Sequence, residues 1–214
     1  MSNLATLLAL SDSRLPTGGH VHSGGVEESV TSGLVTDLGS LRAFLVRRIR
    51  TTGLVTASLA AAVHRGALSA AAGKSGDLET DARTPSPAAR QASRAQGRGL
   101  TRLARRVWAE ENWTELGPTP HLAVAAGCVG RAGGMAHEHT ALSVVYTTMT
   151  GSATAAQRLL ALDPGDVAAV TFELSPLCEQ TAAEAAKDVA DLSDPLLDVL
   201  AQRHIERDRP LFAS

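Results

Sequence analysis

The residues best suited to metal chemistry are two pairs of histidines, each separated by one residue. His20 and His22 form the first pair, and His137 and His139 form the second. Imidazole binds zinc or nickel, but alternate residues of a helix point about 200° apart, so each pair needs a loop or a strand to converge. Capping or surface positions are the commoner role of such histidines. We therefore predict no metal site, and keep nickel binding by His20 and His22 as the alternative.

The most regular polar pattern is a row of arginines. Steps of four residues keep side chains on one face of a helix, and the residues between them supply an apolar side. Guanidinium groups pair well with carboxylates, so this face either docks an acidic partner or is solvated. The row consists of Arg90, Arg94, Arg98 and Arg102, and Arg105 and Arg106 continue it.

Nucleophilic and nucleotide chemistry have little support in the sequence. The chain has no Gly-x-Ser-x-Gly elbow and no spacing that identifies a catalytic triad. The string Gly73-Lys74-Ser75 lacks the earlier glycine of a phosphate loop, because position 68 is leucine. Cys128 and Cys178 are isolated and predict small core residues. We expect a protein without catalytic residues and without a cofactor of its own.

Composition favours helices and excludes several function classes. The 214 residues include 37 alanines, and only 3% are aromatic, which suits helix packing better than a β-sandwich. A formal net charge of −2 and few stacking side chains argue against nucleic-acid binding. No apolar run is long enough to span a bilayer, and we find no signal peptide, so we expect a cytoplasmic protein without membrane contact.

Periodicity predicts a single all-α domain over residues 1–214, a bundle of about eight to ten helices. Asp37 can cap a helix in which apolar residues recur at steps of three and four. Residues Gly73 to Pro87 lack periodicity and predict a flexible surface loop. Near the end of the chain, separate helices are expected at 166–172 and 176–189.

Both ends of the chain carry distinctive segments. Near the start, Pro16, Gly18 and Gly19 predict a structured turn, because paired glycines permit backbone angles that other residues avoid. At the other end, residues 206–214 contain Leu211 and Phe212 beyond a proline. If these apolar side chains docked nowhere, they would expose apolar surface to water, so the segment is expected to be a docking tail.

Four stretches, taken in order, resemble the UreF family of urease accessory proteins. The first runs from Ser11 through Gly19 to Glu27, and the second is the helix Ala89 to Arg98. The third runs from His121 to Gly127, and the fourth is the basic ending from Arg203 to Ser214. Together they cover most of the chain outside the predicted loop.

The resemblance implies an all-α, non-enzymatic adaptor in urease maturation. Members of the family form homodimers, bind accessory protein D (called H in some organisms) and recruit the GTPase accessory protein G. The complex couples GTP hydrolysis to delivery of nickel into apo-urease, so nickel is cargo rather than a cofactor. The residues expected to contact partners are Ser11, Pro16, Gly18, Gly19, Ser23, Glu27, Arg90, Arg94, Arg98, Arg203, His204, Arg209, Leu211 and Phe212.

Overall fold

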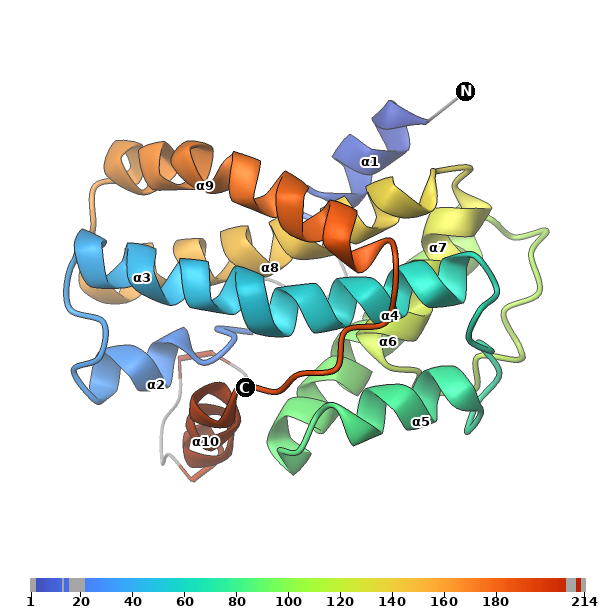
Figure 1. Cartoon of the computed structure of the whole chain (residues 1–214), viewed down its shortest axis with the longest axis horizontal. Helices are drawn as coiled ribbons and strands as arrows, with labels where there is room; N and C mark the ends of the chain where they lie inside the picture. Colours follow the sequence, from blue (N-terminus) through green and yellow to red (C-terminus); the bar gives the residue numbers. More distant parts are fainter. Residues whose placement is uncertain (1–2, 13, 16–21, 207–210, 213–214) are drawn as a thin grey trace.

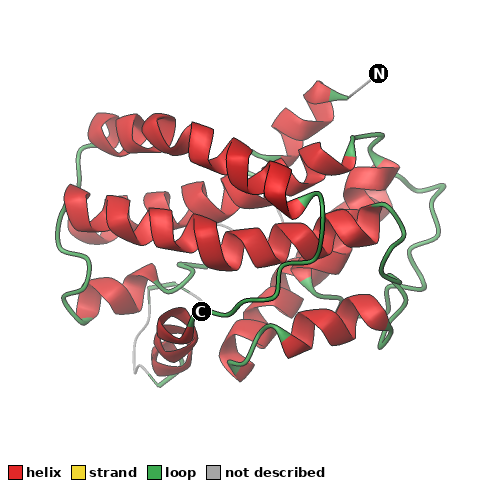
Figure 2. Ribbon diagram, in the orientation of Figure 1, coloured by secondary structure: helices red, strands yellow, loops and turns green. Residues whose placement is uncertain are grey.

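The regular elements of the chain are helices. The computed structural model describes residues 3–12, 14–15, 22–206 and 211–212, and these contain no extended strand (Figure 2). The all-α prediction is confirmed. The elements are α1 (Leu4–Leu10), α2 (Val26–Thr31), α3 (Leu38–Arg48), the π-helical turn η2 (Ile49–Gly53), α4 (Leu54–His64), α5 (Ser75–Ala82), α6 (Pro87–Val107), α7 (Leu122–Ala132), α8 (His137–Leu160), α9 (Pro164–Ala185) and α10 (Pro195–His204).

Local sequence signals fix where several helices begin. The Asp37 carboxylate accepts from the backbone N–H of Ser40, whose hydroxyl in turn accepts from the backbone N–H of Asp37, so α3 starts with a capping box. Helix α6 starts with Ser86 as its cap and proline at its first position, where a missing N–H has no cost. The same arrangement of a capping side chain followed by proline begins α9 and α10. These starts follow directly from the sequence.

The helices form one bundle around a rod made of α3, η2 and α4 (Figure 1). Helix α8 lies behind this rod and packs against α9, α4 and α7, while α6 packs on α7. The core is built largely of small residues, which permit close approach of the helices. At Gly127 of α7, a β-carbon would lie 2.6 Å from the carbonyl oxygen of Ala60, so only glycine lets α4 and α7 meet there. The alanine-rich composition thus serves close helix packing.

The expected flexible loop at 73–87 is wrong, because α5 occupies Ser75–Ala82 within it. Serine, glycine, aspartate and threonine have low helix propensity, so no local signal marks this helix. Tertiary contacts stabilise it: Asp81 accepts hydrogen bonds from His121 and Arg94, and a buried Asp77 also faces Arg94. Packing against the rest of the bundle therefore overrides weak propensity.

Helix α9 replaces the two helices expected at 166–172 and 176–189. Pro176 lies inside it and has no N–H to donate to the carbonyl of Phe172. Phe172 is 79% exposed, so water can solvate that carbonyl. The helix continues because its other face is packed against α8 and α4.

None of the helices in the described residues combines the length and the apolar character needed to cross a bilayer.

Candidate docking site at the C-terminal segment

The site is centred on Glu27 in the first turn of α2. Gly24 and Gly25 precede this helix with φ angles of 63° and 88°, a left-handed conformation that favours glycine. The turn directs the Glu27 side chain inward, and the residue is only 2% exposed. A carboxylate buried this deeply requires partners, because an unpaired buried charge is strongly destabilising.

Those partners come from the opposite end of the chain. His204, at the end of α10, places its Nε2 atom 2.8 Å from Glu27 Oε2. The backbone N–H of Leu211 donates to Glu27 Oε1 at 2.8 Å, and that of Phe212 donates to Oε2 at 3.0 Å. We call Glu27, His204 and the two N–H groups the end clamp. It joins four of the residues that the sequence proposed separately.

The electrostatics of the end clamp favour the ionised carboxylate. Burial alone would raise the pKa of the Glu27 carboxyl. Hydrogen bonds from His204, Leu211 and Phe212 outweigh that effect and hold the pKa below its usual value. Because an ionised carboxylate only accepts hydrogen bonds, His204 must carry its proton on Nε2. The clamp is thus a charged acceptor surrounded by three donors.

The tail held by the end clamp turns one apolar side chain outward and one inward. Leu211 is 79% exposed, whereas Phe212 is partly buried and packs against the core. Two further apolar residues of the same C-terminal segment are exposed, Val199 at 48% and Ile205 at 51%. Sequence reasoning treated Leu211 and Phe212 as equivalent anchors, and the structure separates them. Leu211 is the more exposed of the two.

The serines of the N-terminal motif lie differently from the expected presentation at the surface. Ser23 is fully buried, and its carbonyl oxygen accepts a hydrogen bond from the Ser152 hydroxyl at 3.2 Å. Ser11 is half-buried, with its hydroxyl 3.4 Å from that of Ser143. Arg203 is exposed. The predictions made for Pro16, Gly18, Gly19 and Arg209 fall outside the described residues.

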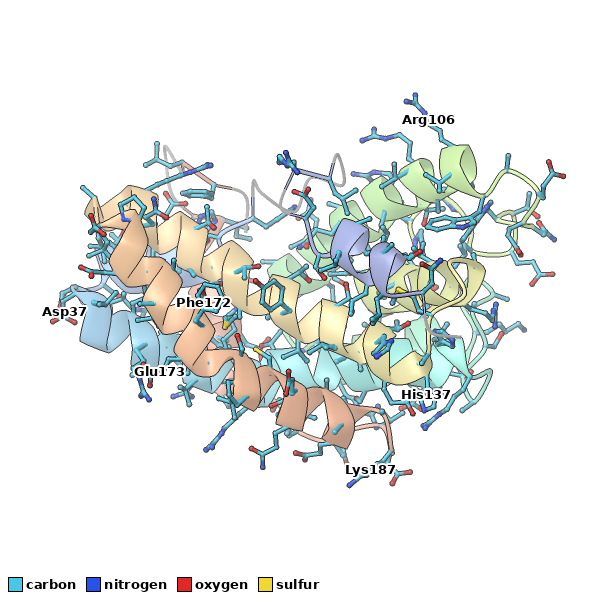
Figure 3. All side chains as sticks on the ribbon, turned by 90° about the horizontal axis from the view of Figure 1, so that it is seen from above. Asp37, Arg106, His137, Phe172, Glu173 and Lys187 are labelled. Carbon is cyan, nitrogen blue, oxygen red and sulfur yellow. The ribbon has the colours of Figure 1, made fainter. Side chains whose placement is uncertain are left out.

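The arginine row divides into a packed part and an exposed part. Arg94 donates to Asp81 at 3.0 Å and to the carbonyl oxygen of Thr119 at 2.9 Å, so it ties α6 to α5. Arg90 lies 3.4 Å from a backbone carbonyl of the loop before α6. The exposed members have no ion pair with any described residue, and Arg106 projects away from the body in Figure 3. They are Arg98, Arg102, Arg105 and Arg106.

A buried polar network around His121 was not predicted as a unit. The ring is fully buried between Asp81, 2.8 Å from Nε2, and the Ser93 hydroxyl, 3.0 Å from Nδ1. Burial lowers the pKa of His121, although the bond to Asp81 opposes this. The bonds connect α5, α6 and the start of α7. The sequence holds no local sign of the network, because its members are separated by 28 and 40 residues.

Of the two histidine pairs, the structure describes both members of the second. His137 lies 3.3 Å from Glu138, and its ring centroid is 6.3 Å from that of His64. Among the residues that the structure describes, no three His, Cys, Asp or Glu side chains are grouped to hold a metal ion. His20 lies outside the described residues.

In this helical bundle, a buried carboxylate of α2 holds the C-terminal segment, and Leu211 is exposed beside it. A sequence model of the UreF family matches residues 35–175. The chain is 84% identical to urease accessory protein UreF of Mycolicibacterium vanbaalenii and 73% identical to that of Mycobacterium sp. strain JLS, over the full length of both chains in each case. It is 68% identical, again at full length, to the Mycobacterium tuberculosis protein of the same name. The chain therefore belongs to the UreF family of urease accessory proteins.

Proposed function

We propose that this chain is a homodimeric, non-catalytic adaptor in the cytoplasmic maturation of urease. It binds accessory protein D (or H) and, with it, recruits the GTPase accessory protein G. The adaptor modulates GTP hydrolysis by that GTPase, which drives nickel insertion into apo-urease. Nickel is the cargo of the assembly, and the chain itself holds no cofactor. Family membership and the end clamp support this proposal.

The observation that carries the proposal is how the tail is held. Its backbone is fixed by two hydrogen bonds to the Glu27 carboxylate, while the Leu211 side chain is left 79% exposed. An apolar side chain on an ordered backbone loses little conformational entropy when a partner covers it. Preorganisation of this kind raises affinity by lowering the entropic cost of binding. Leu211 is therefore the proposed anchor for accessory protein D.

Co-purification with accessory protein D tests this role. Leu211→Ser is expected to reduce capture by at least about tenfold, as for removal of an interface hot spot. Leu78→Ser is the matched control, because Leu78 is 60% exposed on α5 and lies outside the proposed site. Equal capture by Leu211→Ser and the unmodified chain would contradict the proposed anchor.

Two measurements on the isolated chain complete the test. Light scattering should give the mass of a dimer, and a monomer at all concentrations would remove the homodimer from the proposal. Nickel should not bind stoichiometrically without the partners. Stoichiometric nickel that is lost in His22→Ala would instead support the carrier alternative based on His20 and His22.

A further inference from the structure

A cavity of about 590 Å³ lies between the N-terminal motif and the helices that surround it. Its described walls come from residues 10–12, 14–15, 22, 24 and 25, from the rod of α3, η2 and α4, and from parts of α5, α6, α7, α8 and α10. It is lined mainly by small, hydroxyl-bearing and apolar side chains, with Arg48 among them. The adaptor role proposed above makes no use of this space.

Arg48 leaves a donor without a partner at this cavity. Its Nη1 atom donates to the carbonyl oxygen of Gly24 at 2.5 Å, but its buried Nε atom has no hydrogen-bond partner. Within the described residues the other buried side-chain atom in this state is the hydroxyl oxygen of Ser23, next to Gly24 in the chain. Buried polar atoms normally have hydrogen-bond partners. The two that lack one, Arg48 Nε and the Ser23 hydroxyl, both lie beside residues 23 and 24 and therefore need an explanation.

The positive charge of Arg48 is also incompletely matched. Burial lowers its pKa to about 10, so the guanidinium remains charged at neutral pH. Asp194 is the carboxylate that opposes this shift, but it already makes two bonds of 2.6 Å to Arg47. It also accepts from Thr51 and from the backbone of α10. One carboxylate cannot neutralise both arginines.

Several other charged groups of the cavity wall have partners, although Arg158, which also lines it, forms no ion pair with a described residue. Asp12 is paired with Arg14 at 2.6 Å, and Asp198 accepts from the backbone N–H of Ser86 at 3.2 Å. Arg83 is paired with Glu79. Among the described residues, no carboxylate of the wall forms an ion pair with Arg48, and Asp194 is held by Arg47.

Hydroxyl donors follow Arg48 along the same face of the rod. Thr52 and Thr56 line the cavity at successive steps of four residues from Arg48, and neither side chain is hydrogen bonded to a described residue. Thr52 lies in η2, and π-helical turns occur frequently at functional sites. A guanidinium with adjacent hydroxyls is the donor set that proteins use for oxyanions.

Gly24 keeps the space that the guanidinium needs. A β-carbon at this position would lie 2.4 Å from Arg48 Nη2 and 2.5 Å from its Cζ. Any other residue at position 24 would therefore push the guanidinium away from the motif backbone. The arrangement places Arg48 against the cavity rather than at the protein surface.

We propose that this cavity binds a small oxyanion, such as inorganic phosphate or a carboxylate, with the Arg48 guanidinium as its counter-charge and Thr52 and Thr56 as further donors. The oxygens of the anion accept from the part of the guanidinium that lines the cavity, because the Nε atom itself is closed off. This inference is independent of the adaptor role, since the cavity wall does not include Leu211.

Thermal unfolding of the full chain in different anions tests the site. At equal ionic strength, phosphate or acetate at ten times its dissociation constant should raise the unfolding midpoint by roughly 3 to 5 °C over chloride. A response to phosphate alone identifies a tetrahedral oxyanion, and a response to acetate alone identifies a carboxylate. Identical midpoints in all three anions overturn the proposal.

Variants locate the response. Arg48→Met should abolish it, whereas Arg50→Met, which removes an exposed arginine two positions further on, should retain it. Thr52→Val combined with Thr56→Val keeps the charge and should weaken phosphate or acetate binding at least about tenfold by calorimetry, as expected for loss of hydrogen bonds to a charged group. This second variant decides the matter if Arg48→Met does not fold. An unchanged anion response in either variant contradicts the assignment.

Discussion

Two charged side chains beside the N-terminal motif have opposite surroundings, Glu27 being buried and Arg48 half-buried. The Glu27 carboxylate accepts three hydrogen bonds, including one from His204, and is closed off within the protein. The Arg48 guanidinium keeps an unbonded Nε atom at a cavity, and its nearest acid, Asp194, is held by Arg47. A satisfied charge fixes two chain segments together, whereas an unsatisfied one is suited to binding something from outside. The difference separates a structural latch from a ligand site.

The largest expected effect comes from opening the end clamp. Glu27→Ala leaves a buried His204 and two partly buried backbone N–H groups without their acceptor, and should lower the free energy of unfolding by about 3 to 5 kcal/mol. Urea denaturation measures this change. Glu110→Ala, at an exposed glutamate after α6, is the control and should change it by less than about 0.5 kcal/mol. A loss of that small size in Glu27→Ala would show that the clamp does not hold the C-terminal segment on α2.

Removing the tail alone should have an intermediate effect. A chain ended at residue 210 loses the N–H groups of Leu211 and Phe212 but keeps the bond from His204 to Glu27. The free energy of unfolding should fall by about 1 to 3 kcal/mol, because water replaces part of what the two donors supply. Helical circular dichroism should be preserved, whereas capture of accessory protein D should be lost. Retained capture would contradict the docking tail.

Acid should weaken the end clamp in a defined direction. The pKa of Glu27 is below its ordinary value of 4.5, so its contribution to stability is complete above that value. The contribution is lost as the pH falls through the lowered pKa of the folded state. Asp81 and Asp194 have lowered pKa values too, so the relevant quantity is the difference between the unmodified chain and Glu27→Gln. Urea midpoints measured from pH 6 to pH 3 should converge; parallel curves would oppose the assignment.

The smallest change is expected at Arg48. In chloride, Arg48→Met should alter the free energy of unfolding by less than about 1 kcal/mol, because removal of a desolvated charge offsets the lost bond to Gly24. Urea denaturation beside Glu27→Ala makes the contrast direct. A loss of 3 kcal/mol or more, on the same scale, would mean that Arg48 is as structural as Glu27, and the comparison would fail.

Local signals in the sequence were sufficient for the fold class and for many helix boundaries. The capping role of Asp37 and the periodicity of α3 are encoded within a few residues, so they could be predicted. Helix α5 could not, because its stability depends on Asp81 meeting His121, 40 residues further along the chain. The helix break predicted before Pro176 was wrong for a related reason: packing of the other face of α9 compensates for the missing hydrogen bond.

The candidate site was predictable as a set of residues but not as a geometry. Resemblance to a family selected Glu27, His204, Leu211 and Phe212, yet Glu27 and His204 are 177 residues apart and no local pattern joins them. The same reasoning placed Arg94 and Arg98 on one docking face, whereas Arg94 is engaged by Asp81. Arg48 was not selected, because a single arginine in a helix gives no sign that its Nε atom will be buried without a partner.

The end clamp recognises the tail through its main chain. Glu27 accepts from the N–H groups of positions 211 and 212, which every residue except proline possesses. Substitutions at Leu211 can therefore change what the tail offers to a partner without changing how firmly the tail is held. The hydrogen bonds that hold the tail are thus independent of the side chains that it exposes. Evolution can alter the exposed surface of the tail one side chain at a time without weakening its attachment to α2.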